Sequence, residues 1–291
     1  MQILGQVLAN GLFSGGVYAL VAVGYALVYS VLRLVNFAQG GIVTLGAFTA
    51  LLASRISDGN MAVMILATGV VAIVAGWLLE RVAYRPIRQA PPLTAVVTAI
   101  GAAMVIENAI AAAFGYDAHS LPRVGLSPHV WSLWGVRFSN LQLMSLLGVA
   151  VLLTVALRVV RYSRLGRAMR AIADDSELAS LSGIDSDATI SQTFMLASFL
   201  GALAGLVLAL DVGCDPFMGT PIGFKAFVAC VAGGNSLPGA VVGGIALGLC
   251  ESCIGAYVST EFRDAIVMGV LVLILLVRPQ GLTAGLQTRT V

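Results

Sequence analysis

Two ionisable side chains stand inside long apolar runs of this sequence. Glu107 lies beside Asn108 in AAMVIENAIAAAF, and Lys225, the only lysine in the chain, lies in GFKAFVACVA. A charge in an apolar segment is unfavourable unless it is paired or reaches water, so such residues are candidates for binding a polar solute. Each also has a simpler interpretation. Glu107 can bond to a neighbouring helix, and the amine of Lys225 can extend to a polar boundary.

Two polar stretches rich in glycine interrupt the apolar runs, one in each half: NFAQGG (36–41) and VAGGNSLPG (231–239). An interrupted helix offers free backbone groups and helix ends, which make a pathway polar without a buried charge. By analogy with secondary transporters, interruptions in both halves indicate a transport site. Two tight turns are the simpler interpretation, with glycine at positive φ and Pro238 at a helix start. Arg33 is better explained as an anchor beside the first stretch. The predicted pathway residues are Asn36, Gln39, Gly40, Gly41, Glu107, Asn108, Lys225, Gly233, Gly234 and Asn235.

Several other chemistries lack their residue patterns. His119 and His129 are the only histidines, which excludes paired-histidine metal sites, and the single lysine is not part of a GxxxxGK[ST] phosphate loop. Cys250 and Cys253 fall on one face of a helix with no histidine nearby, so we interpret them as small packing residues. The net charge of +2 is too small to indicate nucleic acid. We therefore expect no metal, no cofactor and no covalent catalysis.

Composition identifies the surroundings of these residues. The chain has 291 residues, 59% hydrophobic and 10% charged, with a mean hydropathy of +0.97, whereas a soluble domain is about a quarter charged. We predict an all-α, polytopic membrane protein. A shorter run at 221–234 can form a re-entrant segment, and GALAG (201–205) has the small-residue spacing that lets membrane helices approach closely. About eight transmembrane helices are predicted, near residues 5–30, 41–56, 60–82, 93–114, 140–160, 190–211, 236–257 and 262–278.

Arginine placement predicts the orientation. Five arginines lie within 158–170 and three within 81–88, so both segments should be cytoplasmic. The segment 115–139 should then face the other side, as should the N-terminus, while the basic tail of the chain favours an internal C-terminus. Eight spans cannot satisfy both ends. Either one span is miscounted or the short run at 221–234 also crosses.

The only sizeable hydrophilic stretch is Arg161–Gln192. Its first part has a weakly amphipathic helical pattern. Asp174, Asp175 and Ser176 can then cap a second short helix, which Gly183 can end. The pattern predicts two short helices separated by a break. This projection is either an ordinary solvated loop or an element that docks into a soluble partner.

Within that stretch, GRAMRAIADDSELASLSGID resembles the cytoplasmic loop of permease subunits in branched-chain amino acid ABC importers of the Liv type. Two further blocks resemble the same family, at residues 15–41 and 223–252, so the likeness covers nearly the whole chain in order. The positions that match the family's loop pattern are Gly166, Arg167, Arg170, Ala171, Asp175, Ala179, Leu181, Gly183 and Ile184.

The resemblance implies a single transmembrane permease domain over 1–291 that forms a path by alternating access, with a coupling loop at 161–190. It also implies a bacterial inner-membrane location, a second permease chain (homologous or identical), two cytoplasmic ATP-binding subunits that hydrolyse ATP, and an external substrate-binding protein. This chain would then not be an enzyme. The expected coupling residues are Gly166, Arg167, Arg170, Asp175, Ala179, Leu181, Gly183 and Ile184.

Two alternatives stay open at this point. The cargo can be another small solute, such as urea, an amide, a sugar or an aromatic acid. The departure of Gln39 from the histidine that many relatives carry leaves the exact cargo undetermined. The second alternative is a different class of protein, a stand-alone secondary transporter or channel.

Overall fold

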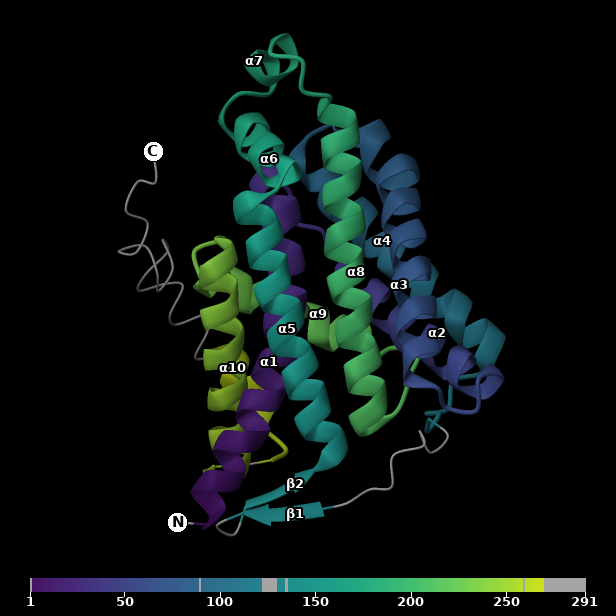
Figure 1. Ribbon diagram of the computed structural model, residues 1–291, viewed down its shortest axis with the longest axis vertical. Helices are drawn as coiled ribbons and strands as arrows, with labels where there is room; N and C mark the ends of the chain where they lie inside the picture. The colour runs from purple at the N-terminus through teal and green to yellow at the C-terminus, as the bar shows by residue number, and fades with distance from the viewer. Residues whose placement is uncertain (1, 89, 122–129, 134–135, 259, 270–291) are drawn as a thin grey trace.

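The computed structural model describes residues 2–88, 90–121, 130–133, 136–258 and 260–269. Helices dominate it, and the chain order is visible in Figure 1. The long helices are α1 (Gln2–Leu32), α2 (Gln39–Ile56), α3 (Met61–Leu78), α4 (Pro92–Phe114), α5 (Asn140–Tyr162), α8 (Ser186–Val212), α9 (Gly219–Ala232) and α10 (Leu237–Tyr257). The shorter elements are a π-helical turn η1 (Leu79–Tyr84), a 3-10 turn η2 (Arg85–Ile87), α6 (Arg164–Asp174), α7 (Ser176–Leu181), and the strands β1 (Val130–Leu133) and β2 (Val136–Ser139).

The all-helical, polytopic prediction is confirmed, with one small exception and a different span count. The exception is the antiparallel β1–β2 hairpin. Within the described part of the chain, 6 helices are long and apolar enough to cross a membrane: Leu4–Leu32, Met61–Ile87, Leu93–Phe114, Asn140–Tyr162, Ser186–Val212 and Leu237–Tyr257. The predicted count of about eight is not confirmed.

The two remaining predicted spans, 41–56 and 262–278, account for the difference in count. The first corresponds to α2, which has only 18 residues. This helix has two glycines in its first turn and Arg55 in its last turn. Most of its side chains are buried inside the protein. The second is helical over residues 263–269, and its remainder lies outside the described residues.

Helices α1 and α8 form the centre of the bundle. Their apolar windows are 83% and 72% buried, while the other four span candidates are at most 39% buried. Both helices are apolar on all sides, and a helix of that kind is stable only where other elements surround it. The outer helices α3, α4 and α5 leave apolar side chains exposed instead, as expected for surfaces in contact with lipid.

Glycines allow α1 and α10 to touch along their backbones. A Cβ atom on Gly15 would lie 2.8 Å from Cα of Ile245, and one on Gly248 would lie 2.2 Å from the nitrogen of Gly15. The predicted GALAG packing is also found, since a Cβ on Gly205 would lie 2.0 Å from the carbonyl oxygen of Val43. These close approaches replace the hydrophobic effect, which is weak between helices in lipid.

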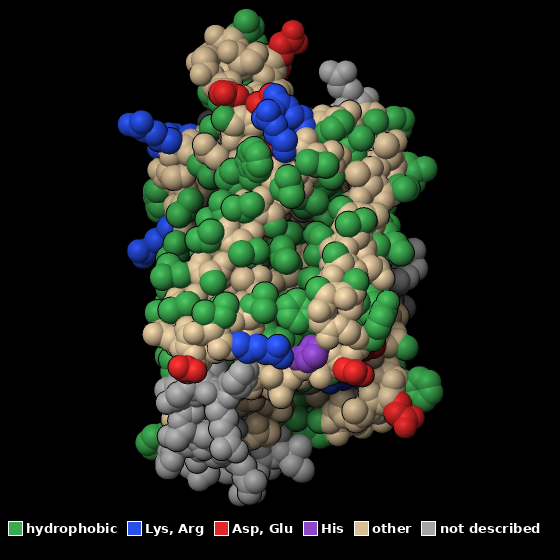
Figure 2. All heavy atoms as spheres, turned by 90° about the vertical axis from the view of Figure 1, so that its right-hand side faces the viewer, with side chains coloured by type: hydrophobic (Ala, Val, Ile, Leu, Met, Phe, Trp, Pro, Cys, Tyr) green, Lys and Arg blue, Asp and Glu red, His purple; other side chains and the backbone are tan. Residues whose placement is uncertain are grey.

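The two basic segments lie at the same end of the protein. Figure 1 shows α6, α7 and the segment between α3 and α4 at the top, and the β1–β2 hairpin and α1 start at the bottom. Arg85 and Arg88 both bond to Asp187 at the start of α8, which ties one basic segment to the end of the hydrophilic stretch that contains most of the other. Most charged side chains visible in Figure 2 lie above and below a band dominated by hydrophobic ones. This arrangement matches the predicted grouping of cytoplasmic segments.

Helix α9 reverses the direction of the chain. The contacts of Gly11 with Leu249 and of Gly15 with Ile245 show that α10 runs antiparallel to α1, and Figure 1 shows α8 doing the same. The chain between α8 and α10 must therefore return, and α9 does this with 14 residues. At 1.5 Å per residue α9 is roughly 21 Å long, shorter than a hydrocarbon core of about 30 Å. The short run at 221–234 therefore corresponds to the segment that reverses the chain between α8 and α10, and the C-terminal end of the predicted topology lies outside the described residues.

Candidate functional site

The first polar break is buried at the centre of the bundle. The chain leaves α1 through Arg33, whose φ is 55°, and starts α2 at Gln39. Asn36 and Gln39 are both 0% exposed. The Tyr84 hydroxyl donates to Oδ1 of Asn36 at 2.9 Å, and Nε2 of Gln39 donates to the carbonyl oxygen of Ala197 at 2.8 Å. Each amide thus uses one polar atom to fix its position.

The other half of each amide is free to bind something else. Nδ2 of Asn36 and Oε1 of Gln39 have no hydrogen-bond partner among the described residues. An unpaired buried polar atom costs about 1–3 kcal/mol. A donor and an acceptor left open in this way are suited to a polar solute or to water.

Glycines on two helices make room for Gln39. A Cβ on Gly24 would lie 2.3 Å from its Nε2 atom, and one on Gly201 would lie 2.5 Å from it. The glutamine therefore fits between α1 and α8 only because both positions lack a side chain. The predicted pathway residues Gly40 and Gly41 contact helices instead. A Cβ on Gly40 would lie 2.7 Å from the Gly219 carbonyl oxygen of α9, and one on Gly41 would lie 3.1 Å from Cα of Ala103 on α4.

An aromatic cluster joins the first break to α9. The ring of Phe37 lies 5.0 Å from that of Phe227 and 5.7 Å from that of Phe224, centroid to centroid. Tyr25 from α1 contacts Phe37 and Phe227 as well. Phe224 is 45% exposed, so one apolar wall of this region reaches the surface of the chain.

Glu107 lies where α4, α2 and α9 meet. Its side chain is 4% exposed, and the Thr220 hydroxyl lies 2.8 Å from both carboxylate oxygens. The Thr44 hydroxyl accepts the Gly219 N–H at 3.0 Å and so holds the start of α9 against α2. Asn108 is not brought into this group. It is exposed, and its amide donates to the Met104 carbonyl oxygen of its own helix.

Lys225 is buried and paired. It is 6% exposed, and its amine donates to Glu251 at 2.9 Å and to Asp264 at 2.8 Å. Arg263 lies 3.3 Å from the same Glu251 oxygen, and the amine also lies 5.8 Å from the Tyr18 ring centroid. The two cations and two carboxylates form a compact group of opposite charges. Asp264 is exposed, so the amine of Lys225 also reaches the edge of the described chain through this ion pair.

The second break is a tight turn. Gly234 and Asn235 have φ of 70° and 54°, and a Cβ on Gly233 would lie 2.2 Å from Gly239. The Ser236 hydroxyl caps α10 by accepting the Gly239 N–H at 3.2 Å. The simpler of the two sequence interpretations therefore describes the backbone of this stretch.

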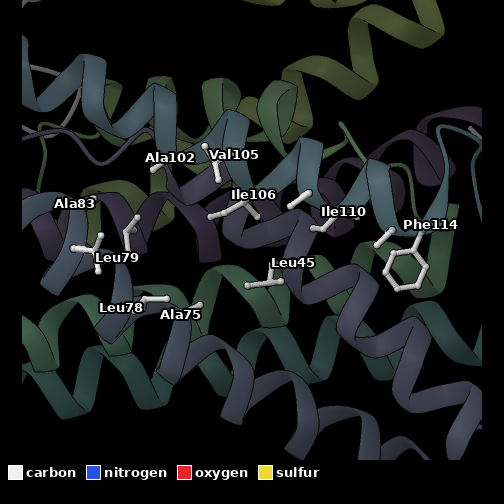
Figure 3. A pocket seen from close by; sticks show the side chains of 13 residues that line it. Leu45, Ala75, Leu78, Leu79, Ala83, Ala102, Val105, Ile106, Ile110 and Phe114 are labelled. Atoms are coloured by element: carbon white, nitrogen blue, oxygen red, sulfur yellow. The ribbon is translucent and has the colours of Figure 1, made fainter.

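Two cavities differ sharply in character. One of about 570 Å³ lies between α2, α3 and α4 and is lined only by apolar side chains, including Leu45, Ile106 and Phe114 (Figure 3). The other, about 380 Å³, lies among α1, α5, α8, α10 and the residues that follow α10, and its polar lining includes Asn10, Asp211 and Arg263. The larger cavity suits lipid chains or another apolar surface, because it offers a polar solute no partner.

The predicted coupling loop folds as two short helices. The Ser163 hydroxyl caps α6 through the Gly166 N–H, and the Asp175 carboxylate caps α7 through the N–H groups of Glu177 and Leu178. Gly183 has φ of 83°, and the Ile184 N–H bonds back to Ala179, which is buried. These caps and the glycine stop agree with the helix–break–helix prediction.

The loop also has a fixed base and an exposed tip. A Cβ on Gly166 would lie 1.7 Å from the Val160 carbonyl oxygen, so α6 folds directly onto the end of α5. Arg167 donates to the Tyr162 carbonyl at 3.1 Å and Arg170 to that of Val160 at 2.9 Å. Cations at a helix C-terminus stabilise its free carbonyls. At the tip, Leu178 and Leu181 are 61% and 80% exposed.

Sequence reasoning missed several partners in these groups. Four residues that bond to a predicted site residue were not themselves predicted: Tyr84, Thr220, Glu251 and Asp264. A hydroxyl or carboxylate near a helix end is common, and only the fold reveals which of them faces Asn36, Glu107 or Lys225. The position of Tyr84 additionally depends on a π-helical turn, which the apolar pattern did not predict.

Comparison with known proteins identifies the family. Residues 7–275 match the family described as branched-chain amino acid transport system / permease component. The chain is 36% identical over 292 residues to LivH, the high-affinity branched-chain amino acid transport system permease protein of Escherichia coli K12, covering 95% of this chain and 94% of that one. It is 33% identical over 290 residues to BraD of Pseudomonas aeruginosa, a protein of the same description, with 95% and 94% covered.

A solved structure shows the same fold in a distant protein. A chain of PsaBC from Streptococcus pneumoniae, in complex with Fab, superimposes with a TM-score of 0.51 at 10% identity, covering 96% of this chain and 94% of that one. At this identity the likeness concerns the fold alone. The family match and the two relatives each span nearly the whole sequence, and the chain therefore belongs to the family of branched-chain amino acid transport permease components.

Proposed function

We propose that this chain is the permease subunit of an ATP-driven importer of branched-chain or related small amino acids in the bacterial inner membrane. The observation that carries the proposal is the α6–α7 projection. It combines a base fixed by Gly166 and two arginines with a tip that exposes Leu178 and Leu181. Short helices with exposed apolar residues are suited to a groove on a partner protein.

The proposed partners follow from this projection and from the family. Two cytoplasmic ATP-binding subunits receive the coupling loop, residues 161–190, and hydrolyse ATP. The permease chain itself, residues 1–291 as one domain, carries out no covalent chemistry. A second permease chain, identical or homologous, completes the path, and an external binding protein delivers the substrate. ATP binding then favours one of two arrangements of the permease pair, which opens the path to alternate sides.

The first break and Glu107 are the proposed contacts for the solute. A zwitterionic amino acid presents an ammonium group and a carboxylate. The Glu107 carboxylate can accept hydrogen bonds from the ammonium group, and Nδ2 of Asn36 can donate to the carboxylate. Phe224 offers an apolar surface for an aliphatic side chain. Gln39 contributes its open acceptor, while Gly40 and Gly41 let α2 approach its neighbours.

The remaining predicted residues are proposed to support the path. Lys225 holds α9 to α10 and to the helix that begins at 263 through its two ion pairs. Gly233, Gly234 and Asn235 set the turn that reverses the chain between α9 and α10. Asn108 faces outward on α4, where it is available to the second permease chain.

Reconstitution tests the proposal. The chain would be purified with its partner subunits, placed in liposomes with the binding protein, and supplied with ATP and radiolabelled leucine. We expect ATP-dependent uptake that valine and isoleucine compete with and that urea, short amides and sugars do not. An ATP-binding subunit unable to hydrolyse ATP is the control. Uptake by the permease alone, driven by an ion gradient, would overturn the proposal, and so would selective competition by one of the other solutes.

A further inference from the structure

The segment between α3 and α4 has an unusual backbone. Residues Leu79–Tyr84 form a π-helical turn, in which the Arg85 N–H bonds to the Glu80 carbonyl five residues earlier. A 3-10 turn follows, and it contains Pro86, which has no N–H to donate. Single π-helical turns are rare and occur frequently at functional sites. This one lies at the same end of the protein as the coupling loop.

On one side the segment bonds to the end of the coupling loop. Arg85 and Arg88 both pair with the carboxylate of Asp187, which lies in the first turn of α8, six residues after the end of α7. Arg88 pairs in addition with Glu80, whose side chain is 2% exposed. One carboxylate therefore receives two guanidinium groups, and one of these groups is anchored on a buried acid. Such a network resists separation better than an isolated surface pair.

On the other side the segment bonds to the polar break. Tyr84 is 0% exposed, and its ring packs against Phe194 of α8 with centroids 4.8 Å apart. Its hydroxyl donates to Asn36 at 2.9 Å. Tyr84 directly precedes Arg85 in the chain, so two neighbouring residues make the contact with Asn36 and the contact with Asp187. Coupling loop and polar break are thus joined through five consecutive residues.

We infer that residues 79–88 form a positioning link that transmits movement of the coupling loop to Asn36, with Tyr84 and Asp187 as its two contact points. The inference rests on the proposed coupling role of residues 161–190. When the ATP-binding subunits displace the α7–α8 junction, Asp187 draws Arg85 and Arg88 with it, and Tyr84 moves the amide of Asn36.

The backbone just before the link is held closely against α8. A Cβ on Gly76 would lie 2.7 Å from the Phe194 carbonyl oxygen and 2.7 Å from the Ser198 hydroxyl, so α3 lies directly against α8 just before the π turn begins. Conversion of a π turn to an α turn changes the hydrogen-bond register by one residue, a rotation of about 100°. A π turn next to a fixed helix can therefore take either of two registers, and a two-state element of this kind can carry energetic coupling between distant sites.

The test compares Tyr84→Phe, Asp187→Asn and a control, Arg81→Gln, in the full reconstituted complex. Arg81 is exposed on the same π turn and makes no ion pair in the described part of the chain. The readout is the number of substrate molecules imported per ATP hydrolysed, together with the amount of assembled complex. We expect Tyr84→Phe and Asp187→Asn each to lower this ratio about fivefold, as the loss of one hydrogen bond allows, with assembly unchanged. Arg81→Gln should match the unmodified protein.

The double variant gives a sharper result. Because the two contacts lie in series, Tyr84→Phe combined with Asp187→Asn should couple no worse than either change alone, whereas independent structural defects would add. Normal coupling in Tyr84→Phe, or additive losses in the double variant, would overturn the link.

A Gly183→Trp variant separates this inference from the coupling proposal on which it rests. Its bulky side chain should uncouple transport by altering the coupling loop itself. If Gly183→Trp uncouples transport while Tyr84→Phe does not, only the link is wrong. If Gly183→Trp also transports normally, the coupling proposal fails as well.

Discussion

The two polar breaks look alike in sequence and are built differently in three dimensions. The first, residues 36–41, takes its contacts from distant parts of the chain: Asn36 bonds to Tyr84 and Gln39 to Ala197. The second, residues 231–239, is stabilised by its own neighbours, with Ser236 capping α10 and Gly233 against Gly239. In the first break, one polar atom of each amide has no hydrogen-bond partner among the described residues. In the second break, the Ser236 hydroxyl donates to the Gly233 carbonyl oxygen within the turn itself. Similar composition thus accompanies a proposed solute-binding surface in one half and a chain reversal in the other.

The largest effect is expected at Lys225, on the helix that precedes the second break. Lys225→Met would leave the buried Glu251 carboxylate with Arg263, 3.3 Å away, as its remaining cation, so the loss should approach the roughly 3–5 kcal/mol that a broken buried pair costs. We expect little folded protein in the membrane, measured as the amount of monodisperse protein that detergent extracts. The double variant Lys225→Met/Glu251→Gln removes both charges and should recover folded protein and import. If the double variant folds but does not import, Lys225 lies in the transport path. The two polar breaks would then differ less in function than we propose.

The next largest effect is expected at the first break. Asn36→Leu removes the buried amide and leaves the Tyr84 hydroxyl without its acceptor, a loss of about 1–3 kcal/mol. We expect ATP-driven import to fall about thirtyfold while the complex still assembles. Uptake assays on equal amounts of purified complex measure this. Unchanged import would mean that the first break is a turn like the second.

Glu107→Gln tests whether the region around the first break contacts the ammonium group of the solute. Glutamine keeps the Thr220 contact and removes the charge that would attract an ammonium group. Because a hydrogen bond to a charged group contributes about 1.5–3 kcal/mol, the substrate concentration for half-maximal import should rise roughly tenfold. Thr68→Val, a buried polar change elsewhere in the bundle, is the matched control. Equal effects of the two variants would contradict a direct role for Glu107.

The smallest effect is expected in the second break itself. Asn235 has φ of 54°, so Asn235→Gly retains the backbone conformation and import should stay within about twofold. Asn235→Val should instead lower the stability of the protein by roughly 1–2 kcal/mol, because a β-branched residue is strained at positive φ. Thermal unfolding followed by tryptophan fluorescence distinguishes the two variants. If Asn235→Gly abolishes import with normal stability, the Asn235 side chain contacts the solute.

The sequence predicted the elements far better than their contacts. Strong apolar runs placed α4 within one residue, at 93–114 against Pro92–Phe114, and α10 equally well, at 236–257 against Leu237–Tyr257. The caps of α7 and the stop at Gly183 followed from local side-chain chemistry. Burial of α2 was not predicted, because an apolar run is the same whether lipid or protein surrounds it.

The partners of the candidate residues required the fold. Asn36 and Tyr84 are 48 positions apart, and Lys225 and Glu251 are 26 apart, so no local spacing rule connects them. From the sequence alone, several other hydroxyl and carboxylate groups could equally have been the hydrogen-bond partners of these residues. The choice among them is made by helix packing, and that packing depends on glycines whose importance appears only when two backbones meet.

The glycine contacts between α1 and α10 have a practical consequence for measuring motion. Because the two backbones touch at Gly15 and Gly248, neither helix can slide or rotate against the other without a steric clash. A pair of spectroscopic labels attached across α1 and α10 should therefore report a constant distance throughout the transport cycle. That pair is an internal ruler, against which labels on α7, on the segment 79–88 and on α9 can be calibrated in the same preparation.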